Sequence, residues 1–217
     1  MAVSRFLLVS LNIKSILGGG PTPGHRRKKL QEMGEGGGLN DAYTATLARV
    51  KAQEGYKSLL GMKVLMWVLY SERPLRAEEL CHALGVEIGS TDLNPEIVPT
   101  FRTLLESCQS LVTVEESSST IRPVHFTLRE YLSNNPNLFH SPHSSIAEVC
   151  LTYLNFRFLW DNSPTPDSPP EMPLEEYAAC YWITHARRGM TENVKALALR
   201  LLNRQASPFG RHVVNPG

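Results

Sequence analysis

The chain has 217 residues, a formal net charge of +1 and 42% hydrophobic residues. This length and composition allow one large domain or two small ones with a real core, which excludes wholesale disorder. A net charge this close to zero lacks the overall positive excess that binds polyanions, which argues against a nucleic-acid-binding protein. No segment reaches the roughly eighteen uninterrupted apolar residues that a membrane span needs, so we expect a cytoplasmic protein with no membrane segment.

The cysteines are far apart in the sequence, with no CxxC pair, and each falls on an apolar helical stripe. This spacing favours buried free thiols in a reducing compartment over disulfides or a zinc site. The four are Cys81, Cys108, Cys150 and Cys180.

Residues 1–55 are expected to form helices that precede a central domain. The run FLLVSLNI is similar to the apolar part of a signal peptide, but polar residues interrupt it and no clean cleavage pattern follows. We therefore predict a helix over residues 3–16, which GGGPTPG ends. The basic stretch HRRKK, residues 25–29, starts a second short helix with a solvated face. A third helix covers LNDAYTATLARVKAQ, with Asn40 or Asp41 as its cap.

Residues 56–135 show the order of elements of a winged-helix domain. KSLLGMKVLMWVLY is apolar on almost all sides, which is typical of a buried central helix. RAEELCHAL predicts a second helix, and a third starts near residue 98 with Pro99 in its first turn. LVTVEE and TIRPVHF flank a serine-rich turn and predict a β-hairpin, in which Pro123 makes the second strand short or places it at an edge.

The remainder is expected to be helical, apart from one proline-rich interruption. SSIAEVCLTYL has helical spacing, with Ser144 or Ser145 as its cap. The fold class is therefore mainly α with a small β-hairpin: a helical segment, a central winged helix and a C-terminal helical linker. The last part divides into a helical extension (136–160), a proline-rich linker (161–173), a helical hairpin (174–205) and a tail (206–217).

Two common catalytic and nucleotide-binding motifs are missing from the sequence. The sequence contains neither a G-x-S-x-G nucleophile elbow nor a GxxxxGK[ST] phosphate loop. We therefore expect no enzyme, no catalytic residue and no cofactor. The stretch HSPH offers His140 and His143 as metal ligands, but no HExxH motif or cysteine pair accompanies them. We interpret HSPH as a polar loop before a helix and predict no metal site.

Winged-helix domains often bind DNA by placing the third helix in the major groove. Here TFRTLLESCQS offers only Arg102, which Glu106 opposes, and the hairpin contributes Glu115 and Glu116. Acidic groups at the wing repel phosphate, so we expect this winged helix to bind protein. Nucleic-acid binding is the alternative, and this charge pattern argues against nucleic acid as a partner.

The stretch VHFTLREYL places His125 between a strand and a helix. Thr127 and Glu130 have the T-x-x-E spacing of a capping box, which predicts a helix starting at Leu128. An imidazole beside a helix N-terminus can donate a hydrogen bond to an anion. It can equally pack and bond a backbone carbonyl, and the local pattern alone favours this second role.

Several stretches together resemble one family over residues 6–203. They are FLLVSLNIKSIL, GLNDAYTATLARV, LxWVLYSERPLRAEEL, PVHFTLREYL, IAEVCLTYL and EEYAACYWITHA. The arrangement is similar to the region after the nucleotide-binding core of fungal NACHT proteins, which are NOD-like members of the STAND class of signalling NTPases. In that family the region contains a winged helix named after GPI inositol-deacylase. A helical linker then leads to ankyrin or other repeats.

The resemblance implies a role for His125, which matches a strand-end histidine that contacts the phosphate of bound ADP in the closed state. It implies partners too: a NACHT nucleotide-binding domain in cis or in trans, and a repeat domain such as ankyrin. ADP or ATP enters only with that core, because the chain has no phosphate loop. The chain is then a non-enzymatic regulatory and protein-interaction module of a NACHT/STAND-type signalling NTPase.

The chain departs from the family in three respects. It lacks the ATPase core, no ankyrin repeat follows Gly217, and Arg76 stands where the family often has a capping Thr or Ser. We expect the start of that helix to be less well fixed. We also expect a truncated product, a fragment of a larger one, or a partner that acts in trans. An inositol-deacylase activity, which the domain's name suggests, would need the missing nucleophile elbow.

Overall fold

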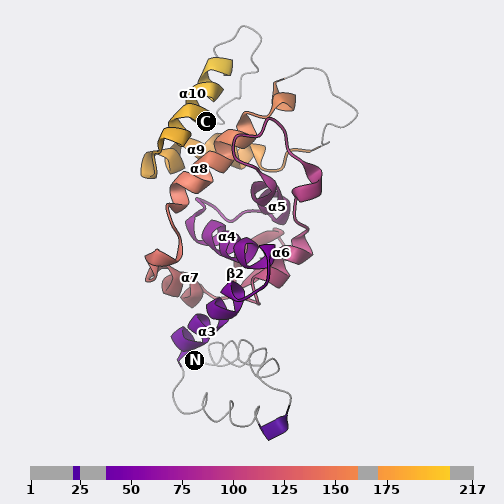
Figure 1. The fold of residues 1–217 in the computed structure, drawn as a ribbon, viewed down its shortest axis with the longest axis vertical. Helices are drawn as coiled ribbons and strands as arrows, with labels where there is room; N and C mark the ends of the chain where they lie inside the picture. Colours follow the sequence, from indigo (N-terminus) through magenta and orange to yellow (C-terminus); the bar gives the residue numbers. More distant parts are fainter. Residues whose placement is uncertain (1–21, 25–37, 161–170, 206–217) are drawn as a thin grey trace.

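The computed structural model describes residues 22–24, 38–160 and 171–205. The predicted helices over residues 3–16 and from residue 25, most of the proline-rich linker and the tail lie outside these ranges. Within them the chain is mainly α-helical with one β-hairpin, as predicted (Figure 1). The α-helices are α3 (Leu39–Lys51), α4 (Tyr56–Tyr70), α5 (Ala77–Gly85), α6 (Phe101–Ser107), α7 (Phe126–Ser133), α8 (Pro142–Leu154), α9 (Glu175–Arg188) and α10 (Glu192–Gln205). The strands are β1 (Val112–Glu115) and β2 (Thr120–Pro123), and short 3₁₀ turns span Pro95–Ile97, Pro136–Leu138 and Arg157–Leu159.

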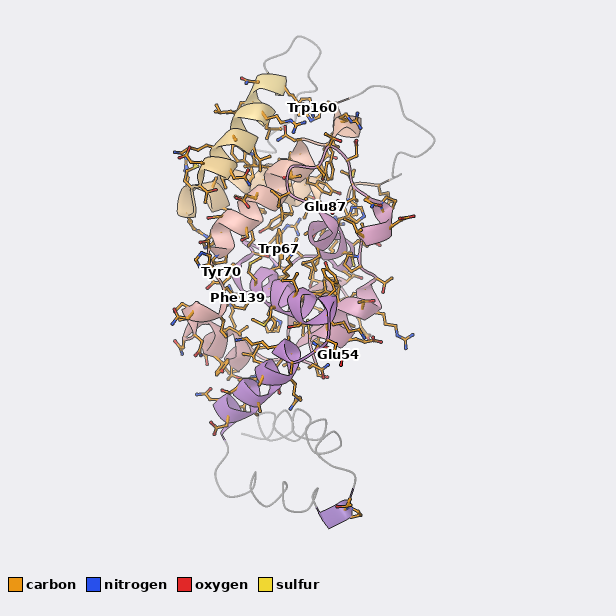
Figure 2. All side chains as sticks on the ribbon, in the orientation of Figure 1. Glu54, Trp67, Tyr70, Glu87, Phe139 and Trp160 are labelled. Carbon is orange, nitrogen blue, oxygen red and sulfur yellow. The ribbon has the colours of Figure 1, made fainter. Side chains whose placement is uncertain are left out.

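Helix α4 is the centre of the fold, as its apolar sequence predicts. It contacts α3, α5, α6, α7, α8 and β2, so other elements cover most of its surface. Trp67, labelled in Figure 2, is buried in its C-terminal half. Its ring lies 5.9 Å from that of Tyr177 on α9. The bare Cα of Gly61 lets α6 approach closely, because a Cβ there would lie 2.5 Å from the carbonyl oxygen of Ser107.

The three helices α4, α5 and α6 and the following hairpin form the winged helix. Strands β1 and β2 pair antiparallel, with Val114 opposite Ile121. On its other side, β2 pairs with the segment before α5, where the amide of Ile121 donates to the carbonyl of Leu75 at 2.8 Å. The second strand is short, as predicted from Pro123, and ends at that residue.

Helix α6 starts later than predicted. We expected it near residue 98, but its first residue is Phe101. Pro99 disfavours the helical conformation for the residue before it, and the preceding 3₁₀ turn is separate. Thr100 caps the helix instead, because its hydroxyl oxygen accepts a hydrogen bond from the amide of Thr103 at 3.3 Å.

Two other predicted caps are wrong by a few residues. Helix α3 is preceded by Gly38, whose amide donates to the carboxylate of Asp41 at 3.0 Å. Asn40 and Asp41 thus lie in the first turn, and Asp41 satisfies the free amide from inside the helix. Helix α8 starts before both predicted capping serines, and Ser144 is buried within its first turns.

Helix α8 connects the winged helix to the last two helices. It contacts α4 on the winged-helix side, and both α9 and α10 pack mainly against it (Figure 1). Asn155 follows α8 directly, and its side-chain amide donates to the carbonyl of Leu197 on α10 at 3.1 Å. Helix α8 is therefore the main element that joins the C-terminal helices to the winged helix, and α9 adds direct contacts such as that of Tyr177 with Trp67.

The thiols behave as the sequence indicates. Cys81, Cys108 and Cys150 are buried and Cys180 is half-buried, and all four are free. Burial raises the pKa of the Cys81 thiol to about 11 and that of Cys108 to about 12. Among the helices of the described ranges, none is both long and apolar enough to cross a membrane.

Candidate functional site

His125 is held at the junction between the wing and α7. It caps the helix with extended backbone, and its Nδ1 accepts a hydrogen bond from the amide of Thr127 at 3.4 Å. The same Nδ1 lies 2.8 Å from the hydroxyl oxygen of Thr127. The imidazole is half-buried, and its ring lies 4.3 Å from that of Phe126.

The predicted capping box of Thr127 and Glu130 is wrong. Helix α7 starts at Phe126, so Thr127 is already its second residue and His125 is the cap. The hydroxyl of Thr127 bonds Tyr43 of α3 at 2.9 Å and the imidazole, which leaves it no capping role. The carboxylate of Glu130 is exposed and hydrogen-bonds to no described residue.

These contacts determine which imidazole nitrogen carries the proton in the neutral ring. Burial raises the pKa of Tyr43, which keeps its phenol protonated and able to donate to Thr127. Thr127 then donates to Nδ1 of His125, so the proton of the neutral imidazole sits on Nε2. Among the described residues none hydrogen-bonds to Nε2. The chain therefore presents an N–H donor without a partner in its described part.

The surface beside His125 combines an exposed aromatic ring with a cation. Phe126 is 65% exposed, and Arg129 lies one helical turn further on the same exposed face of α7. Arg129 lines a cavity of about 150 Å³ that also includes Arg73 and Arg122. We call His125, Phe126 and Arg129 the His125 surface.

Of the three arginines that line this cavity, Arg129 is the one without an ion pair to a described residue. Arg73 pairs with Glu79 at 2.8 Å, and Arg122 pairs with Glu115 at 2.8 Å. In the described ranges, Arg129 forms no ion pair. An anion at the His125 surface would thus meet the Nε2–H donor of His125 and the positive charge of Arg129, which no described carboxylate pairs.

Helix α3, which precedes the winged helix in the sequence, supports the His125 surface through contacts with α7. Tyr43 is fully buried, and its ring lies 5.4 Å from that of Tyr131 on α7. The hydroxyl of Tyr131 lies 2.8 Å from that of Thr44. The hydrogen bond between Tyr43 and Thr127 joins residues 84 positions apart, which helical spacing does not reveal.

The third helix of the winged helix has little net charge to offer DNA. Arg102 is 88% exposed and pairs with Glu106 at 3.2 Å, as the sequence indicated. On the hairpin, Glu115 pairs with Arg122, and Glu116 is exposed. These residues leave no unpaired cation on α6 to meet a phosphate.

The start of α5 is fixed by a buried carboxylate that the sequence did not reveal. Glu79 is fully buried, and its oxygens accept two hydrogen bonds from Arg73, at 2.9 and 2.8 Å. It also accepts from the backbone amide of Arg76 at 2.7 Å, which supplies one half of a capping box. Arg76 itself makes no side-chain cap hydrogen bond, but Glu79 satisfies its free amide from inside the first turn.

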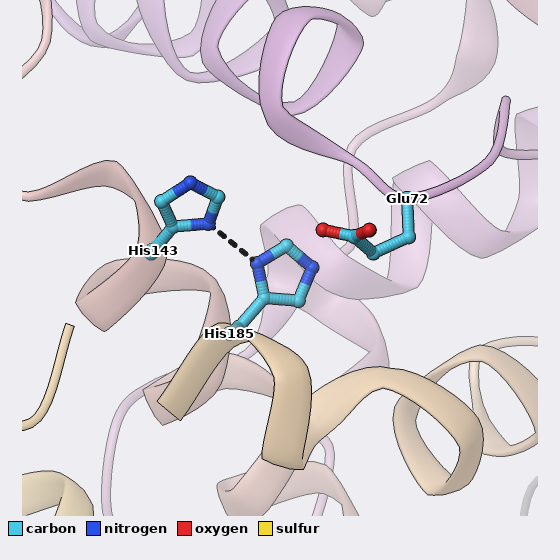
Figure 3. A group of neighbouring side chains, drawn as sticks. All are labelled: Glu72, His143 and His185. Carbon is cyan, nitrogen blue, oxygen red and sulfur yellow. Dashed lines mark hydrogen bonds between the residues drawn. The ribbon is translucent and has the colours of Figure 1, made fainter. Parts of the chain in front are cut away.

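A second cluster of ionisable side chains joins the winged helix to α9. It consists of Glu72, His143 and His185 (Figure 3). HSPH is not a polar loop as predicted, because α8 begins inside it and His143 lies in the first turn. His140 is exposed and lies outside this cluster.

The central region is a winged-helix domain, because it consists of three helices followed by a hairpin. Residues 47–147 match the family model described as GPI inositol-deacylase, winged helix domain. The matched segment supports a winged-helix domain and includes the whole His125 surface. No curated protein and no solved structure matches the chain.

Proposed function

We propose that the chain is a non-enzymatic regulatory and protein-interaction module of a NACHT/STAND-type signalling NTPase. Its winged helix closes onto a nucleotide-binding domain, in cis or in trans, and its C-terminal helices lead toward a repeat domain such as ankyrin. The observation that carries the proposal is the Nε2–H of His125, which bonds to no described residue and lies beside Arg129 in a winged helix that matches the family model. The module acts in the cytoplasm and meets ADP or ATP only through its partner.

The histidine acts by differential affinity. A donor that reaches the ADP phosphate in the closed arrangement, and not in the open one, stabilises the closed arrangement. A hydrogen bond to a charged group contributes about 1.5–3 kcal/mol. Because about 1.4 kcal/mol corresponds to a tenfold change, loss of this contact weakens ADP retention about ten- to a hundredfold.

Protein binding is favoured over nucleic-acid binding by the charge of α6 and the wing. The only arginine of α6, Arg102, is paired with Glu106, and the exposed Glu116 of the hairpin forms no ion pair with a described residue. Fluorescence anisotropy with labelled duplex DNA at low salt tests this alternative. We expect no submicromolar binding, and tight binding that weakens steeply with salt would favour the nucleic-acid reading.

The absence of a phosphate loop and of a nucleophile elbow supports a non-enzymatic role. The purified chain is expected to hydrolyse no ATP, because the sequence has no phosphate loop. It is also expected to react with no fluorophosphonate probe, since there is no nucleophile elbow. Sustained ATP turnover, or labelling of one serine, would contradict the proposal.

The direct test measures binding of the chain to a NACHT-type nucleotide-binding domain by calorimetry. We expect tighter binding to the ADP-loaded than to the ATP-loaded domain. His125→Asn removes the Nε2–H but keeps an oxygen that can cap α7, so it separates anion contact from helix capping. This variant should lose the preference for ADP, whereas His140→Asn should keep it. Equal binding of both nucleotide states by the wild-type chain would overturn the proposal.

A further inference from the structure

Three side chains from distant parts of the sequence converge where the winged helix meets α9. Glu72 follows the end of α4, His143 lies in the first turn of α8, and His185 lies near the end of α9 (Figure 3). The Nδ1 atoms of the two histidines are 2.9 Å apart. One ligand atom from each of the three residues lies within 4.8 Å of those of the other two.

This geometry is close to that of a metal site. A tetrahedral zinc ion with Zn–N distances of roughly 2.0–2.1 Å holds its nitrogen ligands about 3.3 Å apart. The two imidazoles need to separate by only about 0.4 Å from their hydrogen-bonded distance to reach that value. Two imidazoles and one carboxylate are a common donor set for divalent transition metals and leave a coordination position for water.

The second nitrogen of His185 already has the kind of partner that metal-binding histidines use. Its Nε2 lies 2.9 Å from the hydroxyl of Tyr177, which in turn accepts the backbone amide of Glu72 at 3.2 Å. With its proton on Nε2, the ring donates to that hydroxyl and aims the lone pair of Nδ1 at His143.

Glu72 supplies the negative charge that a dication needs. Its carboxylate pairs with Arg188 of α9, whose side chain is half exposed. A metal ion competes with this guanidinium, and Arg188 can move into water when the ion binds. The ring of His143 packs edge-on against Tyr70, 5.4 Å between centroids, so the half-buried ligand is held in place as well.

We propose that Glu72, His143 and His185 bind one divalent transition-metal ion of the zinc class, which locks the C-terminal helices to the winged helix. The proposal is independent of the nucleotide-sensing role, because none of the three residues belongs to the His125 surface. The contrasting reading is a purely structural hydrogen-bond chain through Tyr177 that binds no ion.

The test is a titration of the purified, chelator-treated chain with Zn²⁺, followed by calorimetry and by the unfolding temperature. Co²⁺ serves as a second probe, because its visible absorption reports a tetrahedral site. We expect one equivalent to bind and to raise the unfolding temperature. His143→Gln and Glu72→Gln, which change partly exposed ligands, should each weaken binding at least tenfold. His140→Gln, three residues from a ligand but outside the cluster, should leave binding unchanged.

A further variant separates the metal site from packing. Tyr177→Phe keeps the ring and removes the hydroxyl behind His185, and it should weaken Zn²⁺ binding about ten- to a hundredfold. Far-UV circular dichroism confirms that each variant is folded. Absence of stoichiometric binding by the wild-type chain would overturn the proposal. So would binding that persists in both ligand variants, or that falls equally in His140→Gln.

Discussion

A substitution of the buried Glu79 tests most directly what stabilises the winged helix. Replacing it in Glu79→Gln conserves its size but removes its charge. The amide oxygen can still accept from the backbone of Arg76, but the amide nitrogen then faces the guanidinium of Arg73, which has donors only. The substitution therefore leaves one buried position with two donors and no acceptor.

The structure sets the size of the effect. Removing one partner of a buried ion pair costs about 3–5 kcal/mol. The side chain of Arg73 is 29% exposed and can regain water, so we expect the lower end, about 3 kcal/mol. For a chain of this size, that loss lowers the unfolding temperature by about 6–12 °C.

The effect also depends on pH in a defined direction. Burial alone would raise the pKa of Glu79, but the hydrogen bonds from Arg73 and Arg76 outweigh it and hold the pKa below its ordinary value of 4.5. A carboxyl with a depressed pKa stabilises the fold above its unfolded-state pKa and loses this contribution as pH falls through the folded-state value. The stability difference between wild type and Glu79→Gln should therefore be full at pH 7 and shrink below about pH 4.

Urea unfolding at pH 7 and at pH 3.5, followed by tryptophan fluorescence, measures both effects. Glu78→Gln is the matched control, because it removes the neighbouring carboxylate, which is exposed on the same helical turn. We expect less than about 0.5 kcal/mol for this control. Equal losses in the two variants, or a loss at Glu79 that does not change with pH, would refute the reasoning.

Three further predictions concern packing, thiol access and the His125 surface. Gly61→Ala should lower the free energy of unfolding by about 1–3 kcal/mol, measured by urea unfolding, because the added Cβ would lie 2.5 Å from the carbonyl oxygen of Ser107. With a thiol reagent at pH 8, half-buried Cys180 should react before fully buried Cys108, whose rate should rise only with unfolding, as peptide mapping can show. His125→Ala should destabilise the isolated chain by only about 1 kcal/mol in thermal unfolding, since it removes a helix cap and no core packing.

Local sequence patterns were sufficient for most of the winged helix. The apolar run of α4 indicates a helix covered on most sides, and this is what the structure shows. Pro123 limited the second strand to a few residues, as expected. The charge pattern of Arg102 and Glu106 correctly indicated a paired surface on α6. These features depend on neighbours within a few residues, which the sequence displays directly.

Helix starts were less predictable because several nearby residues can satisfy the same amide. The pattern T-x-x-E pointed to Thr127 as a cap, yet Tyr43 engages that hydroxyl from 84 residues away, and His125 caps the helix. At α3 and α5 the free amide is satisfied from inside the first turn, by Asp41 and Glu79. A cap is therefore decided by tertiary contacts as much as by local sequence.

Local sequence patterns could not predict the cluster of Glu72, His143 and His185. The two histidines are 42 residues apart, and HSPH alone resembled a loop because α8 begins at its proline. His185 is buried on α9, but helical periodicity does not identify what a buried imidazole faces. Such a site becomes visible only when the packing of α9 on α8 is known.

The central claim, that His125 holds ADP in a closed nucleotide-binding domain, is tested most directly by the rate of ADP release. The measurement uses fluorescent ADP bound to a NACHT-type domain in complex with the chain, with His140→Asn as control. The account predicts that His125→Asn speeds release about ten- to a hundredfold, whereas the control matches the wild type. Equal release rates for all three chains would show that His125 makes no contact with the nucleotide.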